Sequence, residues 1–85
     1  MKVYHVCSPK KLAKYQKSGR IKAPARAWAD AFEAVRFSIA TGRPIILRLH
    51  YPDDAKRLPG HGGNAVYLDR DFVLTDDLIP AHGGA

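Results

Sequence analysis

The chain has 85 residues, of which 46% are hydrophobic and 26% charged, and its formal net charge at pH 7 is +6. A chain of this length forms at most one domain with one small core, and its composition excludes a disordered tail. The longest apolar run, PIILRL, is interrupted by Arg48 and is far shorter than the roughly 20 residues that cross a bilayer, which excludes a membrane-spanning helix.

The single cysteine and the N-terminal residues indicate the cellular compartment of the protein. Cys7 has no second cysteine to pair with, and the start of the chain, MKVYHVCS, lacks the apolar stretch of a signal peptide. We therefore expect a cytoplasmic protein that does not associate with membranes.

The positive charge is concentrated in the first third of the chain. Residues 1–29 carry eight Lys and Arg residues and no acid, whereas residues 30–85 carry six cations and eight acids. Such an asymmetry is typical of a protein with an anionic partner, such as nucleic acid, a phosphorylated ligand or an acidic protein. The alternative is a solvated basic face that keeps the protein in solution.

The first predicted elements are a strand and a helix. The alternation in KVYHVC predicts a strand over residues 3–7, with Val3, His5 and Cys7 on one face. Ser8 followed by a proline is a helix start, and Gly19 ends a helix that runs to about residue 18. Its inner face would carry a leucine and a tyrosine, and its outer face would carry lysines.

These lysines and the basic residues that follow them are the candidate nucleic-acid contacts. A row of cations can neutralise backbone phosphates without reading sequence. The candidate residues are Lys10, Lys11, Lys14, Lys17, Arg20 and Lys22.

A second helix is predicted from the spacing of apolar residues. Trp28, Phe32, Val35 and Ile39 fall at i, i+4, i+7 and i+11, which is an apolar stripe of helical period, and Gly42 ends the pattern. We expect Trp28 to pack the helix against the sheet. The alternative is that its ring stacks on a base or a nicotinamide.

The segment PIILRLHYP predicts a central strand, because it is apolar on both faces. Arg48 and His50 share one of its faces. If this strand neighbours the first, His5, Arg48 and His50 could converge on one site, with Arg48 binding an anion and the two histidines serving as general acid and base. The alternatives are a partly buried His5 bonded to the backbone and a surface Arg48.

The remainder of the chain contains a long loop and short elements. Residues 52–64 are predicted to form a loop in which the backbone of Gly60, Gly62 and Gly63 could cup a phosphate and His61 could add a donor. A plain connection is the simpler interpretation. Residues 65–74 predict a hairpin or one bent strand, and residues 75–80 a final helical turn. We expect one compact domain over residues 1–80 and a flexible tail over residues 81–85. The fold class is α+β, with two helices packed on a small antiparallel or mixed sheet.

The opening of the sequence resembles small ADP-ribosyltransferase-fold proteins, in particular the N-terminal half of RNA 2′-phosphotransferases and of DNA ADP-ribosylating toxins. The resemblance rests on Tyr4-His5, the capped helix and the Gly19-Arg20-Ile21 turn, and it extends loosely to Leu49. It implies a reduced version of that fold, NAD as a cofactor, His5 against the NAD ribose and Trp28 near the nicotinamide.

The sequence departs from that family in the third motif, which is usually a glutamate on a late strand. The only glutamate here is Glu33, in the predicted second helix, so Asp69 or Asp71 would have to replace it. The resemblance therefore leaves open whether the chain is an active transferase.

Three other functions remain open from the residues. One is a non-catalytic nucleic-acid-binding module, a second is a small ribonuclease toxin of the toxin–antitoxin type that uses His5 and His50, and a third is a protein whose first helix binds an acidic partner. We expect no metal site, because the four histidines and one cysteine have no paired ligand spacing.

Overall fold

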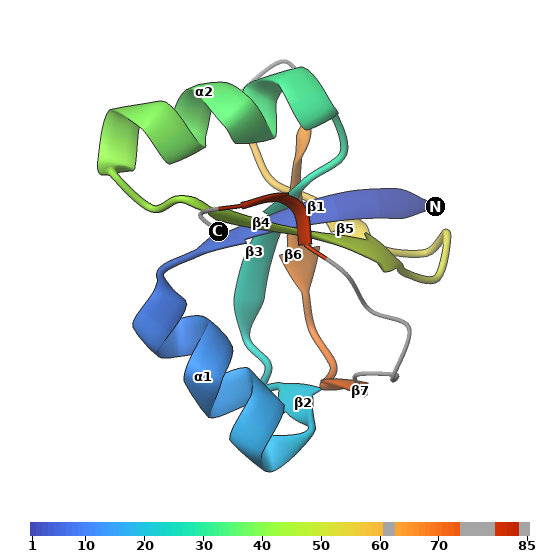
Figure 1. Cartoon of the computed structure of the whole chain (residues 1–85). Helices are drawn as coiled ribbons and strands as arrows, with labels where there is room; N and C mark the ends of the chain where they lie inside the picture. Colours follow the sequence, from blue (N-terminus) through green and yellow to red (C-terminus); the bar gives the residue numbers. More distant parts are fainter. Residues whose placement is uncertain (61–62, 74–79, 84–85) are drawn as a thin grey trace.

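The fold is α+β, with two helices on opposite sides of an antiparallel sheet (Figure 1). The computed structural model describes residues 1–60, 63–73 and 80–83. The elements in chain order are β1 (Lys2–Cys7), α1 (Pro9–Ser18), β2 (Arg20–Ile21), β3 (Ala25–Trp28), α2 (Ala31–Thr41), β4 (Ile45–His50), β5 (Lys56–Arg57), β6 (Ala65–Leu68), β7 (Phe72–Val73) and β8 (Pro80–Gly83).

The main sheet has six strands in the order β5-β6-β3-β1-β4-β8, and β2 and β7 form a separate two-stranded pair. All pairings between the described strands are antiparallel. The apolar segment predicted as a central strand is β4, which lies between β1 and β8, so that prediction is confirmed.

Local sequence explains both ends of α1. The Ser8 hydroxyl accepts a hydrogen bond from the backbone N–H of Lys11, and a proline occupies the first helical turn. Gly19 then adopts a left-handed conformation with φ of 76°, which an L side chain rarely adopts. The predicted boundaries of this helix are confirmed.

Most of the core lies on the α1 side of the sheet. Val3, Leu47 and Leu49 are fully buried there, and Leu12 and Tyr15 of α1 pack against them. A smaller cluster lies on the α2 side, where Ala34 packs against β1 and β4. The sheet is therefore covered unequally on its two faces.

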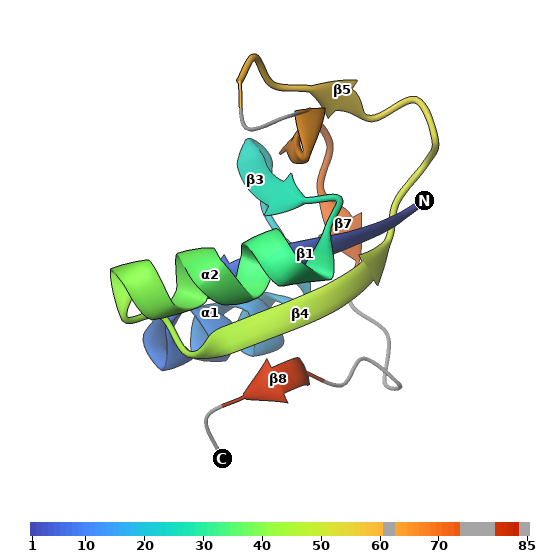
Figure 2. The ribbon, with the colours of Figure 1, turned by 90° about the horizontal axis from the view of Figure 1, so that it is seen from above.

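The predicted orientation of the second helix is wrong. Phe32 and Ile39 are 74% and 77% exposed, and the helix buries Ala34 and Ser38 instead. Helix α2 lies beside β1 and β4 (Figure 2). It turns the small residues Ala34 and Ser38 inward and leaves the apolar stripe exposed. Trp28 is not in the helix but at the end of β3.

Three further differences concern short strands. No strand was predicted over Ala25–Trp28, which is β3, and the predicted loop over residues 52–64 contains β5. Of the two alternatives for residues 65–74, the hairpin is wrong, because β6 pairs with β3 and β5, and β7 pairs with β2.

The end of the chain also differs from expectation. Residues 80–83, most of which were predicted to be a flexible tail, form β8 and pair with β4. The helical turn predicted over residues 75–80 lies almost entirely outside the described residues.

Candidate functional site

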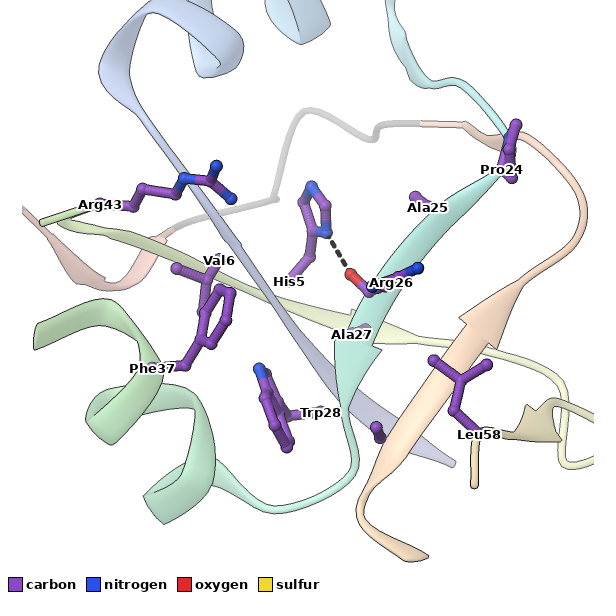
Figure 3. A pocket seen from close by; sticks show the side chains of 11 residues that line it. His5, Val6, Pro24, Ala25, Arg26, Ala27, Trp28, Phe37, Arg43 and Leu58 are labelled. Carbon is purple, nitrogen blue, oxygen red and sulfur yellow. Dashed lines mark hydrogen bonds between the residues drawn. The ribbon is translucent and has the colours of Figure 1, made fainter. Parts of the chain in front are cut away.

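The first strand and its neighbour β3 diverge beside His5. The two strands pair in register at Tyr4 and Trp28, and beyond that point the His5 ring lies between them (Figure 3). The ring reaches the neighbouring strand directly, with 2.7 Å between His5 Nδ1 and the backbone oxygen of Arg26. A side chain thus bridges the two strands where they part.

Both ring nitrogens of His5 have partners, and the side chain is only 7% exposed. A carbonyl oxygen only accepts, so the Arg26 contact places the proton on Nδ1. Nε2 then accepts from the Tyr15 hydroxyl of α1 at 3.0 Å. The sequence left open a His5 bonded to the backbone as the alternative to a ligand-binding His5, and the structure has this arrangement. A ribose hydroxyl could reach Nε2 only by replacing the Tyr15 hydroxyl.

The surroundings of His5 favour its neutral form. Burial lowers the pKa of His5 below its ordinary value of 6.5, the bond to the Arg26 carbonyl opposes this shift, and the charges of Lys11 and Arg43 lower the pKa further. Burial also raises the pKa of the Tyr15 hydroxyl. At neutral pH the pair therefore acts as a neutral hydrogen-bonded unit.

Two adjoining cavities share His5 as a wall. One has a volume of about 490 Å³ and extends along β3 to Trp28 and Phe37. The other has a volume of about 380 Å³ and extends to Lys11, Tyr15 and Lys22. The residues common to both are His5, Val6, Pro24, Ala25 and Arg43. Volumes of this size are typical of small-molecule sites.

Arg43 is held in place at the junction of the two cavities. It follows the left-handed Gly42 that ends α2, its backbone N–H donates to the Ser38 carbonyl at 3.2 Å, and its own carbonyl accepts from the buried Ser38 hydroxyl. Figure 3 shows its side chain directed toward His5. A guanidinium in this position can bind an anion with two parallel hydrogen bonds.

A third cavity, of about 260 Å³, continues the same surface along α1. It shares Lys11, Tyr15 and Lys22 with its neighbour and adds Lys14, Ser18 and Arg20. None of the described residues that line the three cavities is an aspartate or a glutamate. The three cavities therefore adjoin one another as a track, and lysines or arginines line each of them.

The structure brings together only part of the predicted cation set. Lys11, Lys14, Arg20 and Lys22 line the track, and Arg20 also lies 3.5 Å from the Asp71 carboxylate. Lys10 and Lys17 are exposed but line none of these cavities.

The predicted convergence of His5, Arg48 and His50 is wrong. β1 and β4 are indeed neighbours, but His5 is in register with Leu47, whereas Arg48 is in register with Tyr4. Because side chains alternate along a strand, His5 lies on the α1 face and Arg48 and His50 on the α2 face. The two-histidine ribonuclease site therefore has no geometric basis.

Trp28 lines the larger cavity and also packs against α2. Its ring centroid lies 5.6 Å from that of Phe37, with 51° between the ring planes. The expected packing role is thus confirmed in part, since the tryptophan contacts the inner face of the helix from β3 and not from within the helix.

Neither candidate replacement for the late glutamate lies beside His5. Asp69 accepts from the Tyr51 hydroxyl and from Arg70, and Asp71 accepts from the backbone N–H of Ala23. Neither residue lines the cavities described above. The loop residues His61 and Gly62 lie outside the described residues, while Gly60 and Gly63 both adopt positive φ.

No metal centre is formed within the described part of the chain, where no three His, Cys, Asp or Glu side chains cluster. Cys7 lines the smaller cavity, but burial raises the pKa of its thiol to about 11, which opposes a role as a nucleophile at neutral pH.

Sequence reasoning missed Arg43, Arg26 and Tyr15 as residues of the site. Arg43 could have been noted as a cation just before a central strand. Its approach to His5, however, depends on the pairing of β1 with β4, and Arg26 contributes to the His5 contact through a backbone oxygen. No pattern of residue types in the sequence indicates that Arg43 approaches His5 or that the Arg26 backbone oxygen contacts its ring.

No protein-family model matches the sequence, and neither the curated proteins nor the solved structures contain a match. Within the residues described, no helix is long and apolar enough to cross a membrane.

Proposed function

We propose that the protein binds an anionic nucleotide, of which NAD is the first candidate, in the two cavities on either side of His5. The observation that carries this proposal is the positive lining of these cavities, with Arg43 at their junction and no acid among the described lining residues. Arg43 and Lys11 would bind the phosphates. The Trp28 ring would contact the base or nicotinamide.

The similarity of the His5 strand and its capped helix to ADP-ribosyltransferase-fold proteins supports NAD over other anionic nucleotides. Transfer of ADP-ribose is a separate step, for which the usual glutamate is missing from the sequence. The proposal therefore concerns binding of the nucleotide and leaves the transfer step aside.

The test is a calorimetric titration of NAD into the protein, repeated while backbone amide shifts are recorded. We expect the shifts to change at His5, Trp28 and Arg43. Replacing Arg43 with glutamine should weaken binding about tenfold, the loss expected from one charge-assisted contact.

Arg48→Gln is the matched control, since it removes the same charge from a residue that lines neither cavity. It should leave the affinity for NAD unchanged. The absence of any shift near His5 and Trp28 at millimolar NAD would refute the proposal for NAD.

A second candidate function is binding of a nucleic-acid strand, and the third cavity favours it. The cations continue past a dinucleotide-sized space to Lys14 and Arg20 on α1 and β2. A strand that follows this track would bind less tightly as salt rises, because each neutralised phosphate releases counterions.

Lys14 and Lys17 offer a matched pair on one helix, because only Lys14 lines the track. With a short single-stranded RNA as the probe, Lys14→Gln should weaken binding and lower its salt dependence, and Lys17→Gln should do neither. Equal effects of the two substitutions would point to nonspecific attraction by the whole helix.

A further inference from the structure

A chain of two hydrogen bonds leads from strand β3 through His5 to the proposed ligand site. His5 Nδ1 lies 2.7 Å from the Arg26 backbone oxygen, and His5 Nε2 lies 3.0 Å from the Tyr15 hydroxyl. Tyr15 itself lines the two cavities that extend along α1, one of about 380 Å³ and the other of about 260 Å³. The chain of hydrogen bonds therefore ends on a residue that a ligand in these cavities would contact.

The charge of the His5 ring decides the role of the Tyr15 hydroxyl. The carbonyl oxygen of Arg26 can only accept, so Nδ1 carries a proton in both charge states of the ring. Neutral His5 has a lone pair on Nε2 and accepts from the Tyr15 hydroxyl, whereas protonated His5 has an N–H there and donates to the hydroxyl oxygen. Protonation therefore frees the hydroxyl hydrogen of Tyr15 and keeps both contacts of the ring.

We propose that the site takes up a proton together with its anionic ligand: a proton from solvent adds to His5 Nε2, and the Tyr15 hydroxyl turns to donate to a phosphate oxygen of the ligand. The proton on Nδ1 stays on its nitrogen, and the Tyr15 proton stays on its oxygen. This inference rests on the proposed function and adds a form of regulation to it. The nucleotide binds more tightly in mildly acidic solution, with His5 and Tyr15 as the residues that couple binding to pH.

The charges around the ring explain why His5 is neutral before a ligand binds. Burial lowers the pKa of His5 in the free protein, and the cations Lys11 and Arg43 lower it further. A phosphate held between these two cations would offset their repulsion of a third positive charge and attract the proton itself. Because no aspartate or glutamate is among the described residues that line the cavities, the ligand is the source of that negative charge.

The other titratable groups around the cavities do not take over this role. Burial raises the pKa of the Tyr15 hydroxyl, and it raises that of the Cys7 thiol to about 11, so both groups are neutral at neutral pH. Lys22 and Arg26 line one cavity each on the β3 side and add positive charge. The described residues that α2 and β6 contribute to the cavity walls are apolar. His5 is therefore the group whose charge can change in this pH range.

Calorimetry of NAD binding in two buffers of different ionisation enthalpy tests the proposal at about pH 6.5, the ordinary pKa of histidine. We expect the heat to depend on the buffer, by an amount that corresponds to uptake of part of one proton. The dissociation constant should fall by about threefold to tenfold between about pH 7.5 and pH 5.5. The charge of NAD does not change in this range, because its phosphates lack the second proton, with a pKa of about 6, that a phosphate monoester has.

Two variants and their matched controls assign the effect to residues. His5→Gln should abolish both the proton uptake and the pH dependence of binding. Tyr15→Phe removes only the hydroxyl, and it should weaken NAD binding by about tenfold at pH 5.5 and by less at pH 7.5. His50→Gln and Tyr4→Phe should change neither property, because these residues line none of the three cavities.

Nitrogen NMR of the His5 ring reports its protonation in the wild-type chain. At about pH 6.5 we expect a proton on Nδ1 alone in the free protein and protons on both nitrogens when NAD is saturating. Circular dichroism at each pH shows that every protein compared is folded.

Two results would overturn the inference while the proposed function stands. One is NAD binding with a heat that is the same in both buffers and an affinity that does not change with pH. The other is a pH dependence that persists in His5→Gln at its wild-type size. If NAD gives no heat and no shift at any pH, the proposed function itself is wrong, and the coupled proton uptake is wrong with it.

Discussion

The two helices use their apolar residues in opposite ways. Helix α1 follows the simple amphipathic rule, with Leu12 and Tyr15 against the core and lysines toward solvent. Helix α2 buries Ala34 and Ser38 and shows Phe32 and Ile39 to solvent. An apolar stripe thus reports the period of a helix, while close packing on the sheet decides which face points inward.

The same contrast applies to the two faces of the sheet. The α1 face holds the larger core and the His5 ring, whereas the α2 face holds a small cluster of Ala34, Val6 and Ile46, against which Trp28 packs. Most of the core therefore lies on one face of the sheet, while the candidate site takes residues from both faces. Substitutions on each side of the sheet test this difference between the two faces.

The largest effect is expected in the core of the α1 face. Leu47 is fully buried, so Leu47→Ala should lower the free energy of unfolding by about 2–5 kcal/mol through lost burial and a cavity. Ile39→Ala removes an exposed side chain of the same volume from α2, and its effect should stay within about 0.5 kcal/mol. Urea unfolding of both variants measures these losses. Similar losses for the two variants would mean that α2 packs with its stripe inward.

A medium effect is expected where α2 meets the sheet. Ala34 is fully buried against Val6 and Ile46, so Ala34→Leu would overfill that contact and cost about 1–3 kcal/mol. Ala40→Leu makes the same change on the exposed side of the helix and should be close to neutral. Thermal unfolding followed by circular dichroism compares them. If Ala34→Leu were harmless, the small inner residues would not set the distance of the helix from the sheet.

The smallest effect concerns the pH dependence of stability on the α1 face. The pKa of His5 is lower in the folded protein than its ordinary value of 6.5, so the unfolded chain binds a proton first as the pH falls. The stability that comes from neutral His5 is complete above about pH 6.5 and is lost as the pH falls through the lower folded-state pKa.

His5→Gln should remove the loss of unfolding free energy that His5 causes as the pH falls. Urea unfolding between about pH 7.5 and pH 5, a range that brackets the ordinary pKa of histidine, measures this loss. The lowered pKa values of Asp53, Asp69 and Asp71 affect stability only in more acidic solution, because the ordinary value for this group is 3.8. Parallel profiles for the variant and the wild type would show that His5 titrates normally in the folded protein.

Predictions from the sequence succeeded where neighbouring residues determine the structure. The Ser8 cap, the Gly19 stop and the alternation of Val3, His5 and Cys7 are short-range features, and the structure has all of them. The strand β3 was missed because four residues after a proline carry too little periodicity to be recognised. Of the residues singled out from the sequence, Trp28 and Lys11 line the cavities beside His5, whereas Arg48 and His50 do not.

The α+β class, the two helices, the central strand and the basic first third of the chain follow from composition and local spacing in the sequence. The position of His5 opposite Leu47 and not beside Arg48, with Arg43 and Lys11 as charged neighbours, depends on how distant segments pack together. The reason is register: one residue of shift between paired strands moves a side chain to the other face of the sheet. The same holds for α2, whose inward face depends on which side chains let it approach the sheet.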